Sequence, residues 1–175
     1  MCIEETVEEL EKYLADPAKG LPEEIFLLVT RLTPMVNVDL WIRDATGRIL
    51  FTWRNDVHHG QGWHIPGGII RFHETIRARI TAVASGELNS TVRVIGEPLA
   101  MNEFIVPGQR NRSHFLAFLY LCELTAPLPE SLKYREGEPV RGQYAWFDNI
   151  PEKLLPAHEP YRPLFERHFS AREIK

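Results

Sequence analysis

Apolar residues recur at helical spacing between residues 73 and 88, and one carboxylate interrupts their stripe. The apolar positions of this segment are Ile76, Ile80, Val83, Ala84 and Leu88. At about 100° per residue, the acidic side chain of Glu87 falls in the middle of the stripe that these residues form. The pattern predicts a helix from about His73 to Leu88. An acid on the face that packs against the core needs a physical explanation.

Alternating apolar and polar positions predict strands on the N-terminal side of this helix. Positions 36, 38, 40 and 42 are apolar, which predicts a strand over residues 36–42. Turn residues at 44–47 lead into a second strand over 48–54, so we expect these two strands to form a hairpin. A short strand over 63–65 then leads to the turn Pro66-Gly67-Gly68.

The C-terminal half also has the pattern of strands followed by helices. Residues 91–105 alternate imperfectly, which predicts one or two strands. Residues 114–122 are apolar on both faces, which is typical of a central strand covered on both sides. A last strand is predicted over 144–147, followed by helical pieces near 151–155 and 160–169. This order predicts an α/β (α+β) fold with a mixed sheet and helices on both faces.

The N-terminal segment has helical rather than strand character. A helix is predicted over residues 3–15, ended by Asp16-Pro17, and a second one from Pro22 to about Leu32. We therefore expect residues 1–33 to be an N-terminal helical extension that packs on one domain formed by residues 34–175.

Composition narrows the class of protein. With 175 residues, of which 44% are hydrophobic, the chain suffices for one compact domain. Its formal net charge of −4 provides no electrostatic reason for a nucleic acid or an anionic membrane as partner. Cys2 and Cys122 form no CxxC motif and no disulfide framework. No signal-peptide pattern and no apolar run of about 20 residues is present, so we expect a cytoplasmic protein.

The glycine turn and the helix together carry a motif. Gly68, five residues and then Glu74 match the opening of the Nudix box, G-x5-E-x7-R-E-U-x-E-E-x-G-U. In the second half of the box, the apolar position and the second Glu of the E-E pair are kept, as Ala84 and Glu87. The box Arg and the two other Glu residues are replaced by Ala82, Val83 and Gly86.

This pattern of loss resembles the GDP-mannose mannosyl hydrolase branch of the Nudix hydrolases. The resemblance covers roughly residues 25–150 and includes the stretch 33–40, Arg54 and His114. It implies a Nudix-like α/β/α sandwich over 34–175, with Mg²⁺ (or Mn²⁺) as cofactor and a possible homodimer. In that branch a water attacks the sugar anomeric carbon of a nucleoside diphosphate sugar with inversion, and a histidine acts as base.

The sequence departs from that branch beside the glycine turn and at the end of the helix. Ile69 and Ile70 follow the glycines where the branch has an arginine, and Arg71 comes two places later. Asn89 stands where the box has glycine, although asparagine also tolerates a left-handed helix cap.

Glu87 is the candidate metal ligand. An ionised carboxylate on an apolar face is costly unless it is paired, and a divalent cation would remove that cost. The carbonyl of Gly67 is the expected second ligand, and the substrate diphosphate would complete the site. The alternative is that Glu87 reaches solvent from the last helical turn. Glu74 is a further candidate ligand, or else it braces the loop or serves as a first-turn acid favoured by the helix dipole.

His114 is the candidate base. It opens an otherwise apolar strand, and an imidazole there can deprotonate water because its pKa lies near neutral pH. The alternative is a structural histidine at a strand edge. The rival bases are His58, His59, His64 and His73.

Substrate contacts are expected from two groups of side chains. Arg54 could hold diphosphate oxygens and stabilise the departing nucleoside diphosphate. Asp39 and Trp41 share a strand face with Asn37, so they could contact the sugar or the base if that face lines a cleft. The alternative is that the N-terminal helix covers this face. The candidates to replace the missing arginines are Arg71, Arg110 and Arg112, which could equally be solvated surface residues.

Three functions are compatible with these residues. The first is Mg²⁺-dependent hydrolysis of a nucleoside diphosphate sugar at the anomeric carbon. The second is a Nudix-fold module that binds or senses a nucleotide sugar without turnover, which the three lost box residues favour. The third is a pyrophosphohydrolase with a rearranged site.

Overall fold

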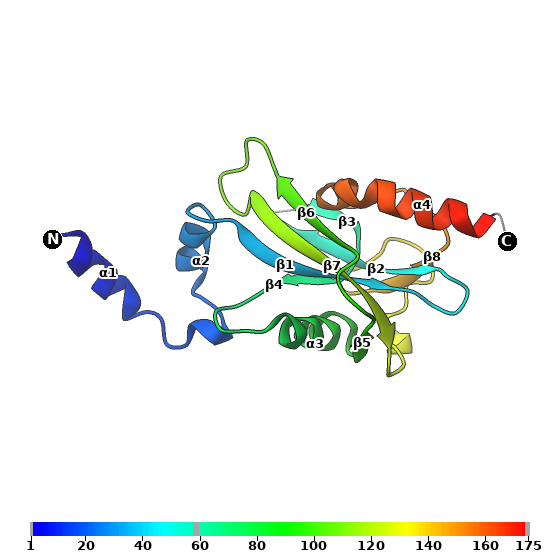
Figure 1. Cartoon of the computed structure of the whole chain (residues 1–175), viewed down its shortest axis with the longest axis horizontal. Coiled ribbons are helices and arrows are strands. Elements are labelled where there is room, and N and C mark those ends of the chain that lie inside the picture. The colour runs from blue at the N-terminus through cyan, green and yellow to red at the C-terminus, as the bar shows by residue number, and fades with distance from the viewer. Residues whose placement is uncertain (1, 58–59, 174–175) are drawn as a thin grey trace.

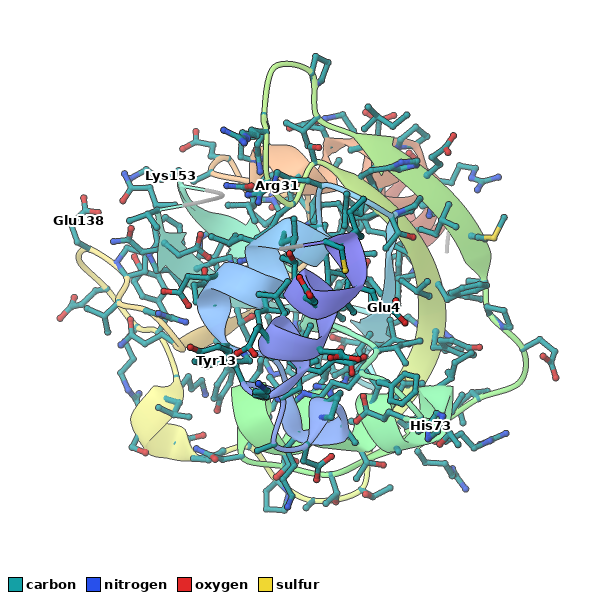
Figure 2. The ribbon with its side chains drawn as sticks, turned by 90° about the vertical axis from the view of Figure 1, so that its left-hand side faces the viewer. Glu4, Tyr13, Arg31, His73, Glu138 and Lys153 are labelled. Atoms are coloured by element: carbon teal, nitrogen blue, oxygen red, sulfur yellow. The ribbon has the colours of Figure 1, made fainter. Side chains whose placement is uncertain are left out.

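The computed structural model describes residues 2–57 and 60–173 of the chain. The rival bases His58 and His59 lie outside the described residues. At the N-terminus, helix α1 (Ile3–Glu11), the short 3-10 helix η1 (Pro17–Lys19) and helix α2 (Glu23–Val29) extend from one end of the molecule (Figure 1). Both α-helices are shorter than their sequence patterns predict. Figure 2 looks onto this end and shows α1 and α2 in front of the strands.

The larger sheet is mixed. Its strands are β1 (Met35–Ile42), β4 (Gly67–Ile69), β5 (Val92–Val94), β6 (Ala100–Ile105) and β7 (His114–Leu124). Strand β1 pairs in parallel with β7, and the other pairs are antiparallel. The predicted central position of β7 is confirmed, since β1 lies on one side of it and β5 and β6 on the other. The second face of β7 is half-buried rather than fully covered.

The smaller sheet overturns the predicted hairpin. Strand β2 (Ile49–Asp56) pairs with β3 (Gly60–His64) and with β8 (Tyr144–Phe147), in the order β3-β2-β8. In the described chain, β1 and β2 are joined only by an isolated bridge between Arg43 and Ile49. Both faces of β2 are apolar: Leu50 belongs to one core cluster and Phe51 to the other. Strand β2 is therefore covered on both faces, and it lies in the smaller sheet rather than beside β1.

Helices cover both sides of the sheets, so the predicted fold class is confirmed (Figure 1). Helix α3 (Ile76–Leu88) packs its apolar stripe on β1 and encloses one core cluster. The 3-10 helix η3 (Pro156–Tyr161) and helix α4 (Arg162–Glu173) enclose the other, which is rich in aromatic residues. A helix at 151–155 was expected, but Leu154 instead makes a parallel bridge with Trp63. A 3-10 helix, η2 (Glu130–Leu132), lies in the loop before β8.

The ends of α3 are decided by residue chemistry. The helix begins three residues later than predicted because His73 has a positive φ of 56°, which an α-helix does not accept. The Thr75 hydroxyl caps the N-terminus by accepting a hydrogen bond from the Ala78 N–H. At the other end Asn89 adopts the left-handed conformation, with φ 45° and ψ 41°, as the sequence predicts.

Candidate active site

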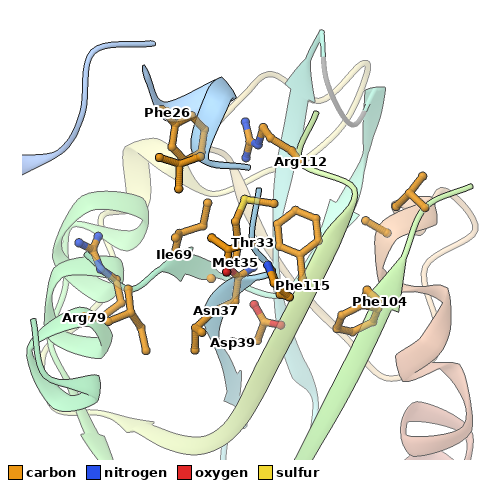
Figure 3. A pocket seen from close by; sticks show the side chains of 18 of the residues that line it. Phe26, Thr33, Met35, Asn37, Asp39, Ile69, Arg79, Phe104, Arg112 and Phe115 are labelled. Carbon is orange, nitrogen blue, oxygen red and sulfur yellow. The ribbon is translucent and has the colours of Figure 1, made fainter. Parts of the chain in front are cut away.

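A cavity of about 1360 Å³ opens between α2, β1, β4, β6 and η3 (Figure 3). Side chains on one face of β1 mark its depth, with Met35 near α2, Asn37 in the middle and Asp39 furthest in. Residues two apart on a strand point to the same face at a spacing of about 7 Å, so these side chains form a graded floor. We call the part around Asp39 the inner end and the part that extends from Asn37 to α2 the outer end.

Two carboxylates meet at Gly67 in the inner end. The Gly67 N–H donates a hydrogen bond of 3.3 Å to Oε1 of Glu87. A Cβ atom at Gly67 would collide with the Asp39 carboxylate, so glycine is required for this approach. Asp39 is buried, and Glu87 is half-buried. Glu87 is therefore tolerated on the apolar stripe because it points to Gly67, where polar groups surround it. Gly67 belongs to strand β4 rather than to the predicted turn, since Gly67–Ile69 pair with β1.

Neutral groups surround the two acids. The Tyr161 hydroxyl donates a hydrogen bond of 2.5 Å to Oδ2 of Asp39. The Thr52 hydroxyl lies 3.0 Å from His64 Nε2 and 3.4 Å from Glu87 Oε2. His64 Nδ1 lies 2.8 Å from the Ile65 carbonyl, an acceptor, so this nitrogen carries the proton. Burial holds the pKa of His64 well below its usual value, which makes the imidazole neutral.

Burial changes the acidity of both carboxyl groups. It raises the pKa of Asp39 to about 6, against the smaller opposing effects of the Tyr161 hydrogen bond and the positive charge of Arg54. Burial raises the pKa of Glu87 to about 7, although Arg54 and the Gly67 N–H favour the ionised form. The nearby charge of Asp39 pushes the pKa of Glu87 up further. A carboxyl group with such a pKa can exchange a proton near neutral pH.

Two arginines approach the same part of the cavity. Arg54, at the end of β2, makes an ion pair of 2.6 Å through Nε with Asp56. Arg112 precedes β7, and its pKa is lowered by burial and by the positive charge of Arg54. Two guanidinium groups close enough to repel one another favour an anion between them. Arg71 also lines the cavity, beside Gly20 of the N-terminal segment.

Five predicted site residues do not line the cavity: Trp41, Glu74, Glu87, Arg110 and His114. Glu87 touches the lining through its hydrogen bond with Gly67. Trp41 is buried under α4, with its ring centroid 5.1 Å from that of Phe165. His114 is half-buried, with Nε2 3.1 Å from Oε1 of Glu103. Arg110 is in the loop between β6 and β7. The expected sharing of one strand face by residues 37, 39 and 41 is correct, but α4 covers the face from 41 onward.

Glu74 braces the loop before α3. Its Oε2 accepts hydrogen bonds from the Arg71 N–H at 2.9 Å and from Nε of Arg79 at 2.7 Å. It precedes Glu87 by 13 positions, and the helix from Ile76 to Glu87, rising about 1.5 Å per residue, lies between them, so the two carboxylates are far apart. Glu74 therefore does not share a site with Glu87. The rival base His73 is exposed and stacks on Phe72, with ring centroids 3.9 Å apart.

The inner end fits a divalent cation only in part. Among the described residues, no group of three or more His, Cys, Asp and Glu side chains could hold a metal ion. Glu87 and the Gly67 carbonyl are oxygen donors of the kind that Mg²⁺ prefers. The contact between the two residues is made by the Gly67 N–H, so Glu87 alone fits only an ion that takes most of its ligands from water and from a bound diphosphate.

Sequence reasoning missed two inner residues. Thr52 is the one polar residue in the run Ile49 to Trp53, and it lies two positions from Arg54 on the same strand face. This interruption was a usable signal. Tyr161 had none, because the helix predicted near 160–169 does not indicate that this residue reaches Asp39 across 122 positions of sequence.

Comparisons with known proteins give limited sequence matches. No protein-family model matches the chain. The low-salt glycan biosynthesis protein Agl8 of Haloferax volcanii is 31% identical over 78 residues, which cover 45% of this chain and 49% of that protein. The chain thus spans about half the length of this curated relative.

Solved structures match far more of the chain. The MutT protein of Methanosarcina mazei Go1 aligns with a TM-score of 0.58 and 22% identity, over 82% of this chain and 98% of its own. A Nudix hydrolase from Nitrosomonas europaea aligns with a TM-score of 0.58 and 17% identity, over 79% of this chain and 90% of its own. A UDP-X diphosphatase aligns with a TM-score of 0.56 and 15% identity, over 98% of this chain and 91% of its own. This chain has the Nudix fold.

Proposed function

We propose that this Nudix-fold chain hydrolyses a nucleoside diphosphate sugar at the anomeric carbon of the sugar. The observation that carries the proposal is the meeting of Asp39 and Glu87 at Gly67. Asp39, Gly67, Arg54 and Arg112 line one cavity, and Glu87 reaches its edge through the hydrogen bond with Gly67. This arrangement offers a proton acceptor beside a site for a diphosphate. The name of the relative Agl8 refers to glycan biosynthesis, which supports a sugar-linked substrate.

Asp39 is the general base of the proposed reaction, in place of His114. Its carboxylate lies in the cavity, is oriented by the Tyr161 hydroxyl and has a pKa of about 6. His64 also lines the cavity, but both of its ring nitrogens have hydrogen-bond partners. It therefore serves better as a neutral support for Thr52 than as a base.

The chemical step is a single displacement. A water oxygen forms a bond to the anomeric carbon while Asp39 takes a proton from that water. The bond between the anomeric carbon and the diphosphate oxygen breaks, and its electron pair leaves with the nucleoside diphosphate. Arg54 and Arg112 stabilise the negative charge that grows on this leaving group.

Glu87 and the Gly67 carbonyl would hold a Mg²⁺ or Mn²⁺ ion. When bound, the ion supplies positive charge beside the leaving diphosphate. Because the protein contributes one carboxylate from the helix, we expect the ion to bind weakly alone and tightly together with a diphosphate.

The altered box positions favour attack on carbon over attack on phosphorus. Val83 stands where the box has a Glu, and it is buried against Gly68; a Cβ on Gly68 would be 2.9 Å from its Cγ2. Gly86 adds no carboxylate on the exposed side of the helix. A pyrophosphohydrolase that relies on several carboxylate-bound cations has no ligands at these positions.

A sensing module is the second candidate, and the same replacements favour it. Val83 and Gly86 leave a cavity that can receive a nucleotide sugar with few groups to activate water. Calorimetric binding of GDP-mannose without any product after long incubation would select this reading.

The deciding experiment is product analysis. The protein is incubated with GDP-mannose, GDP-glucose and UDP-glucose in ¹⁸O-labelled water, with Mg²⁺ or Mn²⁺. We expect nucleoside diphosphate and free hexose, with the label in the hexose. Nucleoside monophosphate and sugar phosphate would instead identify a pyrophosphohydrolase.

The assembly state is part of the proposal. Helix α1 exposes Ile3, Val7 and Leu10, and none of its residues is buried by the rest of the described chain. We propose a homodimer, which analytical ultracentrifugation tests. None of the described helices is both long and apolar enough to cross a lipid bilayer.

A further inference from the structure

The outer end of the cavity contains a buried polar atom that lacks a partner. Oδ1 of Asn37 is buried and accepts no hydrogen bond from any described residue. Asn37 lines the cavity from the middle of β1 (Figure 3). Leaving a buried acceptor unpaired is costly, so a ligand that donates a hydrogen bond at this point would recover that cost.

The apolar surface beside Asn37 comes from two distant parts of the chain. Phe26 of α2 and Ile69 of β4 line the cavity together with Met35. Figure 3 shows Phe26 and Ile69 on the same side of the opening, above Asn37. An aromatic ring and a branched aliphatic chain next to a polar acceptor form a surface suited to a flat ring with a polar edge.

The N-terminal segment is attached at this place by specific contacts. The Arg112 guanidinium lies 5.6 Å from the centroid of the Phe26 ring. The Arg112 N–H donates to the Thr30 hydroxyl at 3.1 Å, and Nη1 of Arg31 donates to Oδ1 of Asn111 at 3.0 Å. These contacts hold Phe26 beside the arginine that we assign to the diphosphate.

We propose that the outer end is a nucleobase subsite, in which Phe26 stacks on the base and Oδ1 of Asn37 accepts a hydrogen bond from its edge. This inference rests on the proposed binding of a nucleoside diphosphate. Arg112 connects the two, because it lies over the Phe26 ring and reaches toward the diphosphate. Helix α2 is then a specificity-determining part of the substrate site.

A hydrocarbon tail is the alternative occupant of an apolar surface. A diphosphate with an aliphatic tail could satisfy Arg54 and Arg112, but it would leave Oδ1 of Asn37 without a donor. All common nucleobases present an N–H on their edges, so a base pairs this atom and an aliphatic chain does not.

The test compares probes that do and do not carry a base. Binding of GDP and of inorganic pyrophosphate to the full chain is measured by calorimetry with Mg²⁺. Stacking on an aromatic side chain contributes about 1–3 kcal/mol per base, so F26A is expected to weaken GDP binding about tenfold or more. Pyrophosphate affinity should stay within about twofold of wild type, and F26Y should retain GDP affinity.

Two further variants separate the roles. N37L removes the acceptor and fills similar space, so it should weaken GDP binding while sparing pyrophosphate. L32A is the matched control: Leu32 lies just after α2 and is 73% exposed, so this change should leave both affinities unchanged.

Three results would overturn the base subsite. The first is equal loss of GDP and pyrophosphate binding in F26A, which indicates a structural role. The second is unchanged GDP binding in both F26A and N37L. The third is tighter binding of geranyl diphosphate than of GDP with the same dependence on Phe26. Because binding is read without turnover, a chain that binds GDP through Phe26 but releases no hexose refutes only the proposed hydrolysis.

Discussion

The two ends of the cavity differ in whether their polar groups have hydrogen-bond partners within the protein. In the inner end, Asp39, Glu87 and His64 all have hydrogen-bond partners within the protein. In the outer end, Asn37 has an unpaired oxygen, and the half-buried ring of Phe26 faces the cavity. The inner end is suited to holding reactive groups in one geometry, since its polar network determines their positions. The outer end is suited to receiving a ligand.

The difference also concerns stability. Burial of two acids in the inner end opposes their ionisation, so at neutral pH these groups work against folding. Among the described residues, the two carboxyl groups whose pKa is raised, Asp39 and Glu87, both lie at the inner end. Chemistry and stability therefore conflict at one end of the cavity, while binding specificity at the other end can change at little cost to the fold. Four comparisons, three between paired variants and one between D39N and wild type, can contradict or sharpen this contrast.

The largest expected effect is on turnover. D39N keeps the shape of the side chain but removes the proposed base, and a positioned base contributes about 10²- to 10⁴-fold to a rate. We expect kcat for the best nucleotide sugar to fall by that amount. H114Q is the control, since His114 does not itself line the cavity, although its partner Glu103 does, and the change should alter kcat by less than about twofold. A larger loss of kcat in H114Q than in D39N would instead identify His114 as the base.

The next effect is on folding and concerns two glycines. In G67A the new methyl group meets the Asp39 carboxylate and lies 3.0 Å from the Val38 carbonyl. Overpacking of this kind costs about 1–3 kcal/mol, and we expect the upper part of that range in urea unfolding. In G86A the methyl group meets nothing within 4 Å on an exposed helix position. That variant should be about 0.5–1 kcal/mol more stable than wild type.

The third effect is a pH dependence of stability. The pKa of Asp39 is about 6 in the folded protein and 3.8 in an ordinary setting. The folded state therefore holds more protons than the unfolded state between these values, and stability falls as pH rises from about 4 to 6. D39N should remove this loss and be about 1–3 kcal/mol more stable than wild type at pH 8. At pH 3.5 the two proteins should unfold at similar urea concentrations; a constant difference would contradict the raised pKa.

The smallest expected effect separates two arginines on one loop. R112A removes a cation beside Arg54 and should raise KM about tenfold, as the loss of about 1.4 kcal/mol of binding predicts. R110A removes a charge outside the cavity lining and should change KM by less than about twofold. Steady-state kinetics at two salt concentrations checks both. Equal effects would mean that general surface charge, rather than a built site, attracts the substrate.

Elements with a short-range pattern were predicted well. The helix that carries Glu87, its left-handed cap at Asn89 and the central strand from His114 follow from spacing and residue type over a few turns or pairs. The hairpin of β1 and β2 was wrong, because strand pairing depends on distant partners. In this chain β2 pairs with β3 and β8, and β1 pairs with β4 and β7.

The candidate site was predictable only where a residue contradicts its local pattern. Glu87 interrupts an apolar stripe and Asp39 an apolar strand, so both could be selected as candidates. His114 and Trp41 look equally suitable in sequence. Neither lines the cavity in the structure: His114 contacts Glu103, which does line it, and α4 covers Trp41. Those neighbours come from other parts of the chain.

The sequence by itself determined most of the helices and strands and the presence of acids where apolar residues are expected. Periodicity and turn chemistry act over a few residues, so they are readable without the fold. The predicted glycine turn was wrong, because Gly67–Ile69 form strand β4 beside β1, and the predicted helix at 151–155 is absent. The tertiary structure alone decided that Tyr161 orients Asp39, that Glu87 meets it at Gly67, and that Phe26 faces the same cavity. These contacts join residues that are far apart in the chain, and only packing of the sheets and helices sets which of them become neighbours.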